Sequence, residues 1–262
     1  MAAPRPAYRH LRVARDGAVA TVTLARPPVN AVDLDVIDDF LRLVAELGDD
    51  GGVRAVILTG EGRTFCAGAD VAMMRDLSPE HHRRVRRWVD VQAGLEALPK
   101  PVIAAINGHA LGGGAELALA CDLRLAADDA EIGFPEIRLG IFPGASGTQR
   151  LPRLVGPARA LQLMMEGRRL RADEARGLGL VDDVTPRDDL LRAAQARART
   201  LAEGPTRAIG LLKRCVYQGS GRPLAEGLRV EADAVAELIR TDDAREGLEA
   251  FLAKRPPRFT GS

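Results

Sequence analysis

Two glutamates in a glycine-rich region are the residues of this chain best suited to proton transfer. Glu116 ends the stretch NGHALGGGAE (107–116), and Glu136 ends FPE (134–136) twenty positions later. Glycine has no β-carbon, so a ligand can approach the backbone closely. A helix that begins at these glycines would also present unpaired N–H groups. Two carboxylates beside backbone donors can move a proton next to a carbonyl that gains negative charge, which indicates an enzyme acting on a carbonyl compound.

The composition fits a globular enzyme and argues against a polyanionic partner. The chain has 262 residues, of which 46% are apolar, enough for a sizeable core in one large domain or two small ones. The formal net charge is +1, and the charges are dispersed along the chain. Aromatic residues make up only 3%, so there are few platforms on which the bases of single-stranded nucleic acid could stack.

The cysteines and the apolar segments predict a soluble, cytoplasmic protein without a membrane partner. Cys66, Cys121 and Cys215 are widely spaced and form no CxxC pair, which suggests neither a disulfide framework nor a zinc site. The first ten residues lack the apolar core of a signal peptide. No window is apolar for long enough to span a bilayer.

Alternating strand and helix patterns must position the glutamates. Strand patterns occur at 11–15, 18–24, 53–59 and 101–106, the first two flanking an Asp-Gly turn typical of a hairpin. Apolar residues at helical spacing predict helices at 33–47, 79–98 and 113–120. Strands become sparse after about residue 140, and from residue 157 the pattern is nearly all helical. We therefore expect a layered α/β body with a helical C-terminal region.

Seven ordered segments resemble the enoyl-CoA hydratase/isomerase (crotonase) family. They are RPPVNA (26–31), FCAGAD (65–70), KPVIAAING (100–108), LGGGAE (111–116), FPE (134–136), PGASGTQRL (143–151) and REGLEAFLAKR (245–255). Each is weak alone, but the ordered set is highly specific, and the resemblance extends from about residue 8 to residue 259. It implies an α/β fold, with a crotonase-like spiral of ββα units and the acyl-CoA site at 1–200, and a helical C-terminal trimerisation region at 201–262.

The resemblance implies an oxyanion hole made by the backbone N–H groups of Ala69 and Gly113. An acyl-CoA thioester would place its carbonyl oxygen between them, where each preorganised donor is worth about 3–4 kcal/mol when that oxygen becomes enolate-like. Taken without the other motifs, the glycines at 112–114 could equally serve close packing of a strand on a helix. The remaining substrate-binding positions implied by the family are Ala67, Gly68, Asp70, Val71, Ala72, Gly112 and Lys254.

In hydratases of this family, glutamates at both matching positions hold one water against the enoyl double bond. The resemblance makes Glu136 the main general acid/base, while Glu116 positions the water and helps to activate it. The water adds its oxygen to Cβ and a proton arrives at Cα, giving a 3-hydroxyacyl-CoA. Burial and like charge both raise carboxylate pKa values, which favours shared protons. In an arbitrary protein, Glu136 would be interpreted as an exposed loop residue and Glu116 as an exposed helix residue.

Two positions depart from the family pattern. Many hydratases carry Arg-Pro-x-x-x-Asn-Ala with a CoA-facing basic residue inside, whereas residues 26–30 are one residue shorter and contain no such residue. Ser146 stands where glycine is usual in Pro-Gly-x-Gly-Gly-Thr. A serine tolerates fewer backbone conformations; its hydroxyl could lie near the acyl group, or the change could be a neutral exchange of small residues. Lys254 could equally belong to an ordinary solvated basic tail.

The predicted function is that of an enoyl-CoA hydratase in fatty-acid or related acyl-CoA catabolism, without a metal or redox cofactor. His81 and His82 lie in an arginine-rich run without spaced acidic or cysteine partners, which favours a solvated helix face over a metal site. One alternative is a double-bond isomerase that uses Glu136 alone. Another is a non-catalytic acyl-CoA-binding or RNA-binding scaffold, disfavoured by both glutamates and by the near-neutral charge. The family also implies a homotrimer or homohexamer. The acyl group is not predicted.

Overall fold

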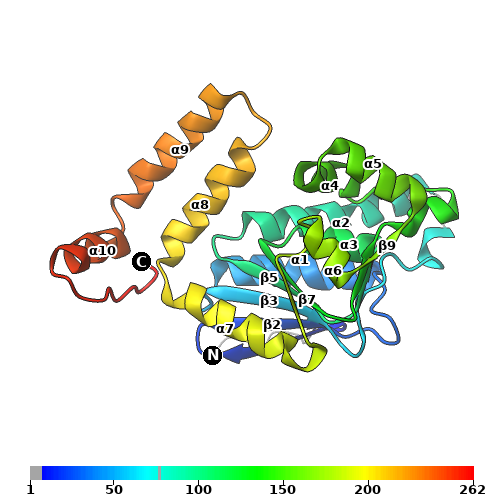
Figure 1. Ribbon diagram of the computed structural model, residues 1–262, viewed down its shortest axis with the longest axis horizontal. Helices are drawn as coiled ribbons and strands as arrows, with labels where there is room; N and C mark the ends of the chain where they lie inside the picture. Colours follow the sequence, from blue (N-terminus) through cyan, green and yellow to red (C-terminus); the bar gives the residue numbers. More distant parts are fainter. Residues whose placement is uncertain (1–7, 76–77) are drawn as a thin grey trace.

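The described part of the chain, residues 8–75 and 78–262 of a computed structural model, is built on two sheets (Figure 1). The larger sheet has the order β1-β2-β3-β5-β7-β10, formed by β1 Leu11–Asp16, β2 Val19–Leu24, β3 Ala55–Gly60, β5 Val102–Ile106, β7 Leu123–Ala127 and β10 Asp183–Thr185. The smaller sheet has the order β4-β6-β8-β9, formed by β4 Thr64–Cys66, β6 His109–Leu111, β8 Glu131–Gly133 and β9 Arg169–Arg171.

Helices cover the sheets and continue beyond them. The α-helices are α1 Leu34–Asp49, α2 Pro79–Ala97, α3 Gly113–Leu119, α4 Gly147–Val155, α5 Pro157–Glu166, α6 Ala172–Gly177, α7 Leu190–Glu203, α8 Thr206–Gly219, α9 Leu224–Leu238 and α10 Asp242–Leu252. Short 3₁₀ helices are η1 Met73–Arg75, η2 Pro135–Leu139 and η3 Arg187–Asp189. In Figure 1, α8, α9 and α10 extend from the body as an arm, while α4 and α5 lie at the opposite end.

Each turn of the chain contributes one strand to each sheet, which produces a spiral. The strands β3, β5 and β7 pair in parallel in the larger sheet, and each is followed directly by a strand of the smaller sheet, β4, β6 or β8, which also pair in parallel. All six residues of β3 are buried, as expected for a parallel strand covered on both faces. The spiral brings the segments that follow β4, β6 and β8 to one edge of the molecule.

The predicted layered body and helical C-terminal region agree with this arrangement. The hairpin, the strands near 53–59 and 101–106 and the three predicted helices are present, with ends shifted by a few residues. The prediction that residues from 157 onward are nearly all helical was wrong at β9 and β10, which are strands. Each is only three residues long, so it shows too little alternation to be recognised. The domain boundary near residue 200 stays a prediction.

The arm is joined to the body by buried polar contacts. Lys213 on α8 lies with its Nζ 2.7 Å from Asp122 Oδ2 and donates to the Lys100 carbonyl at 2.9 Å. The Lys100 side chain is itself buried and donates to the carbonyls of Leu47 and Asp50 at 2.5 and 2.9 Å. A buried ammonium group is stable only with such partners. The contacts of Lys213 therefore hold α8 against the body.

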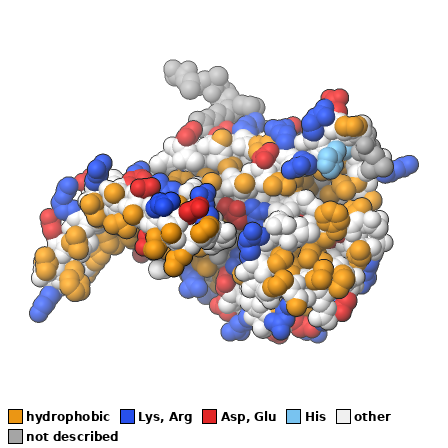
Figure 2. All heavy atoms as spheres, turned by 90° about the horizontal axis from the view of Figure 1, so that it is seen from above, with side chains coloured by type: hydrophobic (Ala, Val, Ile, Leu, Met, Phe, Trp, Pro, Cys, Tyr) orange, Lys and Arg blue, Asp and Glu red, His pale blue; other side chains and the backbone are white. Residues whose placement is uncertain are grey.

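The arm itself carries many exposed apolar side chains, visible along its surface in Figure 2. They are Leu212, Val216, Leu224, Leu228, Val235, Ile239, Leu248, Phe251 and Leu252, each at least half exposed. Contiguous apolar surface of this kind marks an interaction site in a water-exposed chain. None of the described helices is long and apolar enough to cross a membrane.

Candidate active site

Two backbone segments come into direct contact where the smaller sheet leads into α3. Gly68 has φ +94°, and a β-carbon on it would lie 2.7 Å from the Leu111 carbonyl oxygen and 3.1 Å from the Gly113 nitrogen. Side chains of L residues rarely adopt this backbone conformation, and here there is also no room for one. The segment after β4 and the segment after β6 therefore meet because glycine stands at the crossing.

The amides of Ala69 and Gly113 lie side by side at this crossing. The Val32 amide donates to the Gly68 carbonyl and the Asp70 amide donates to the Val32 carbonyl, both at 2.8 Å, which directs the Ala69 N–H away from Val32. Gly113 is the first residue of α3, so its N–H has no acceptor within the helix. Neither amide has a hydrogen-bond acceptor among the described residues. The pair is available to one oxygen atom of a ligand.

Glu116 lies on α3, one turn after Gly113, and is only 2% exposed. Its Oε1 accepts hydrogen bonds from the amides of Ala145 and Gly147, at 3.0 and 2.7 Å. Burial raises the pKa of Glu116 to about 7, and the charge of Glu136 adds to the increase, against the two amide hydrogen bonds and Arg150, which lower it. The burial contradicts the interpretation of Glu116 as an exposed helix residue.

Glu136 approaches the same place from η2. It is half-buried rather than exposed, and a β-carbon on Gly112 would lie 2.8 Å from its Oε1. Its Oε2 is buried and has no hydrogen-bond partner among the described residues. Burial raises the pKa of Glu136 to about 7. A carboxylate oxygen that is buried without a partner is costly unless it is protonated or meets a ligand.

A pocket adjoins the segment after β4. It is lined by His10, Arg26, Pro27, Pro28, Val29, Ala31, Ala67, Ala69, Asp70, Val71 and Ala72. Of the predicted substrate-binding residues, Ala67, Asp70, Val71 and Ala72 line this pocket, together with the Ala69 of the predicted oxyanion hole. Gly68 and Gly112 belong to the backbone crossing beside it. Lys254 is not among the residues that line the pocket: it is exposed and follows α10, in the C-terminal arm.

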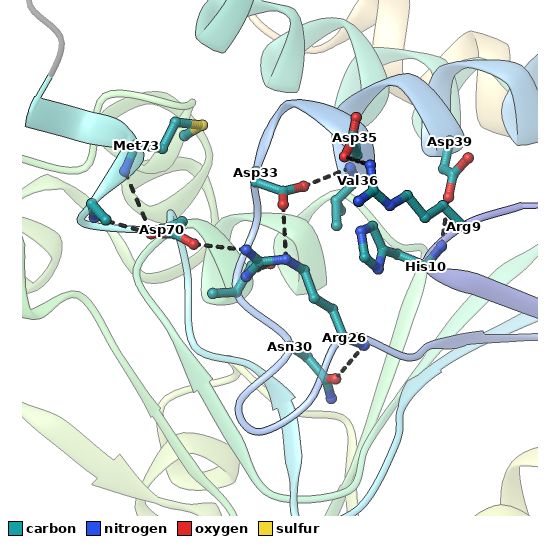
Figure 3. Close-up of polar contacts among 12 residues, drawn as sticks. Arg9, His10, Arg26, Asn30, Asp33, Asp35, Val36, Asp39, Asp70 and Met73 are labelled. Carbon is teal, nitrogen blue, oxygen red and sulfur yellow. Dashed lines mark hydrogen bonds and ion pairs between the residues drawn. The ribbon is translucent and has the colours of Figure 1, made fainter.

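Sequence reasoning missed the role of Arg26 in shaping the pocket. Its Nε lies 2.8 Å from Asp33 Oδ2 and its Nη2 lies 2.8 Å from Asp70 Oδ2, as Figure 3 shows. The Arg26 guanidinium lowers the pKa of Asp70. Asn30, which is buried, accepts from the Arg26 amide at 3.0 Å. Arg26 and Asp70 stand in two of the recognised motifs, but nothing in the linear sequence signals that they pair.

One group of described residues has the spacing of metal ligands, although the sequence did not draw attention to it. Ligand atoms of His10, Asp33 and Asp35 lie within 4.8 Å of one another. However, Asp33 accepts from the Val36 amide and pairs with Arg26, and Asp35 pairs with Arg9 (Figure 3). These partners already neutralise both carboxylates, so we assign no metal to this group.

Comparison with known proteins places the chain in a family. Residues 14–262 match the family model described as "Enoyl-CoA hydratase/isomerase". The chain belongs to this family. It is 41% identical over 257 residues to a "Crotonyl-CoA hydratase" of Syntrophomonas wolfei, covering 97% of this chain and 98% of the relative. A "Short-chain-enoyl-CoA hydratase" of Clostridium acetobutylicum is 39% identical over 244 residues, with 92% and 94% covered.

Solved structures confirm the predicted crotonase fold. An enoyl-CoA hydratase from Bacillus anthracis superposes with a TM-score of 0.92 at 40% identity, covering 97% of this chain and 100% of that chain. A structure from Geobacillus kaustophilus gives a TM-score of 0.94 at 33% identity, with 98% of both chains covered. The protein is therefore an enzyme of the enoyl-CoA hydratase/isomerase family. The roles of its individual site residues stay predictions.

The backbone crossing can be tested with alanine variants of two glycines that both have positive φ. Alanine at Gly62, where φ is +73° and no atom lies within 4 Å of a β-carbon, should lower the free energy of unfolding by about 1–2 kcal/mol. Alanine at Gly68 should cost a further 1–3 kcal/mol or so, because it also meets the Leu111 carbonyl. Urea denaturation measures both; equal losses would contradict the close contact.

The raised pKa of Glu116 predicts a dependence of stability on pH. In the folded chain Glu116 keeps its proton up to about pH 7, whereas the unfolded chain loses it near pH 4.5. Its contribution to stability is therefore fully present below pH 4.5 and is lost as the pH rises to about 7. We expect Glu116→Gln to be more stable than the wild type by about 3 kcal/mol at pH 8 and nearly equal to it at pH 4. The free energies of unfolding of both proteins, measured at pH 4 and pH 8, test this. A difference in stability that does not change with pH would contradict the raised pKa of Glu116.

Proposed function

We propose that the protein is an enoyl-CoA hydratase, which adds water to the same face of a 2-enoyl-CoA double bond and produces a 3-hydroxyacyl-CoA. The observation that carries this proposal is the pair Glu116 and Glu136, both with a pKa near 7, next to two amides without acceptors. At neutral pH such a pair can hold one proton and one negative charge, which water addition requires.

The thioester carbonyl would lie between the amides of Ala69 and Gly113. As water attacks Cβ, negative charge moves to the carbonyl oxygen, where these two donors stabilise it without rearranging. The backbone crossing at Gly68 holds the donors in place before the substrate arrives. This arrangement lowers the energy of an enolate-like transition state more than that of the neutral thioester, which is what accelerates the reaction.

The two glutamates would then divide the proton transfers. Glu116, whose Oε1 already accepts two amide hydrogen bonds, orients the water and helps to activate it. Glu136 acts as the main acid and base, since its buried Oε2 has no other partner among the described residues. The water oxygen bonds to Cβ, the glutamate pair receives the proton that the water loses, and one glutamate proton moves to Cα. The charge of the pair is unchanged at the end.

The CoA part of the substrate would follow the pocket beside Ala67–Ala72. Arg26 cannot replace the CoA-facing basic residue that the shortened 26–30 loop lacks, because its charge is already paired with Asp33 and Asp70. Phosphate groups therefore need another cation. Lys254 is exposed just after α10 and could reach such a pocket from a second copy of the chain. The pathway would be fatty-acid or related acyl-CoA catabolism.

Hydration is tested by the loss of the conjugated-thioester absorbance of crotonyl-CoA, with identification of the product. We expect the wild type to form 3-hydroxybutyryl-CoA and each of Glu116→Gln and Glu136→Gln to lower kcat by about 10²- to 10⁴-fold. Glu166→Gln, exposed on α5, is the matched control and should retain wild-type activity.

Three results would oppose the proposal. If crotonyl-CoA and longer 2-enoyl-CoA esters bind without hydration, while a 3-enoyl-CoA is converted to its 2-enoyl isomer, the protein is an isomerase that needs Glu136. If CoA esters bind and neither reaction occurs, the chain is a non-catalytic binding scaffold. Retained activity in both glutamate variants would remove them from the mechanism.

We also propose that the arm assembles the chain into a homotrimer or a homohexamer. The support is the apolar surface of α8–α10, which the body of its own chain leaves exposed. Light scattering should give three or six times the mass of one chain. Phe251→Glu, at a side chain 81% exposed, should lower that mass, whereas Arg229→Glu, at an exposed polar position of α9, should not. A monomeric wild type would contradict this assembly.

A further inference from the structure

The loop that holds Glu116 has a serine in a strained conformation at its centre. Ser146 lies between Ala145 and Gly147, the two residues whose amides donate to Glu116 Oε1. Its backbone has φ +105°, in the region that favours glycine. A non-glycine residue persists there only when its surroundings hold it.

The Ser146 hydroxyl crosses to α2 instead of capping its own helix. Ser146 directly precedes α4, yet its side chain accepts no hydrogen bond from the amides of that helix. Its Oγ donates to Oε1 of Gln92, a residue of α2 with no exposed surface. The middle of the loop is thereby attached to a buried side chain 54 positions earlier in the sequence.

The orientation of the Gln92 amide is set from its other side. Arg150 Nη1 donates to the same Oε1 at 3.1 Å, while its Nε and Nη2 donate to the two carboxylate oxygens of Glu96 at 2.6 and 2.7 Å. Arginine has donors only, so Gln92 must present its oxygen to Arg150 and to Ser146. The buried Nε2 of Gln92 has no acceptor among the described residues. Thus a continuous set of contacts runs from α2 to the loop.

We propose that Ser146 and Gln92 are positioning residues: their hydrogen bond fixes the loop so that the Ala145 and Gly147 amides both point at Glu116. The catalytic part of this inference rests on the proposed hydratase function. With glycine at position 146, the backbone could leave this conformation freely, and either amide could turn away from Glu116. The β-carbon of the serine opposes this conformation, so the bond to Gln92 is what holds the loop in it.

Three variants separate positioning from folding. Ser146→Ala removes the hydroxyl and keeps the strain, Ser146→Gly removes both, and Gln92→Leu removes the acceptor. All three should lower kcat for crotonyl-CoA about 2- to 10-fold, the effect of one hydrogen bond, with KM within about twofold of the wild type. The melting temperature should fall in the alanine variant but stay equal or rise in the glycine variant, since glycine relieves the strain. A purely structural role would move activity and stability together.

A double variant and a control complete the set. Because the two residues act through one contact, the double variant Ser146→Ala with Gln92→Leu should have about the same kcat as the less active of the two single variants. Gln149→Ala, exposed on α4 and two residues from the loop amide of Gly147, should match the wild type. Additive losses in the double variant would overturn the proposed coupling.

A second readout does not depend on hydration. The Glu116 carboxyl can be titrated by NMR on protein with isotope-labelled glutamate, assigned with Glu116→Gln. The charged groups near it are Glu136 from η2 and Arg150 from α4. Loosening the loop weakens the amide bonds that stabilise the carboxylate, so the Glu116 pKa should rise in Ser146→Ala and Gln92→Leu. An unchanged pKa with unchanged kcat overturns the inference. A raised pKa in the variants of a protein that hydrates no enoyl-CoA overturns the proposed function alone.

Discussion

The contact between two backbone segments at Gly68 is the constraint on which the rest of the site depends. The Gly68 α-carbon lies so close to the Leu111 carbonyl and the Gly113 nitrogen that no side chain fits between them. Only this approach places the Ala69 amide beside the Gly113 amide, and α3 then carries Glu116 one turn further on. Two strands of the smaller sheet deliver these segments, so the spiral of the fold and the geometry of the donors have the same origin.

Helix α2 supports both halves of the site from one side. Trp88 donates through Nε1 to the Gly113 carbonyl at 3.3 Å, and its ring packs edge-on against Phe40 with centroids 5.4 Å apart. One turn later, Gln92 accepts a hydrogen bond from the hydroxyl of Ser146, in the loop around Glu116. The oxyanion donors and the carboxylate loop therefore share a single rigid support. A shift of α2 would change both together, which ties the reacting groups to the packing of one helix.

The sequence was sufficient for the parts of the molecule that depend on local patterns. Ordered motifs singled out Glu116, Glu136, Ala69 and Gly113, whose roles stay predictions, and periodicity found the long strands and helices. It was insufficient where a contact joins distant segments. Three-residue strands have no detectable period, and the pairing of Arg26 with Asp70 depends on how the turns of the spiral stack. Ser146 was recognised as unusual, but its link to Gln92 requires the register of α2 against α4, which no single segment encodes.

The burial of two lysines has a consequence for the chemical reactivity of the surface. The chain has three lysines among 37 basic residues. Lys100 and Lys213 are enclosed by carbonyl oxygens at the junction of arm and body, which leaves Lys254 as the lysine amine open to solvent. An amine-directed reagent, or an acetyltransferase, would thus meet essentially one lysine side chain on the folded protein. That side chain lies on the arm, so a label on it, distinguished from one on the α-amino group by peptide mapping, can follow how the arms of several chains come together.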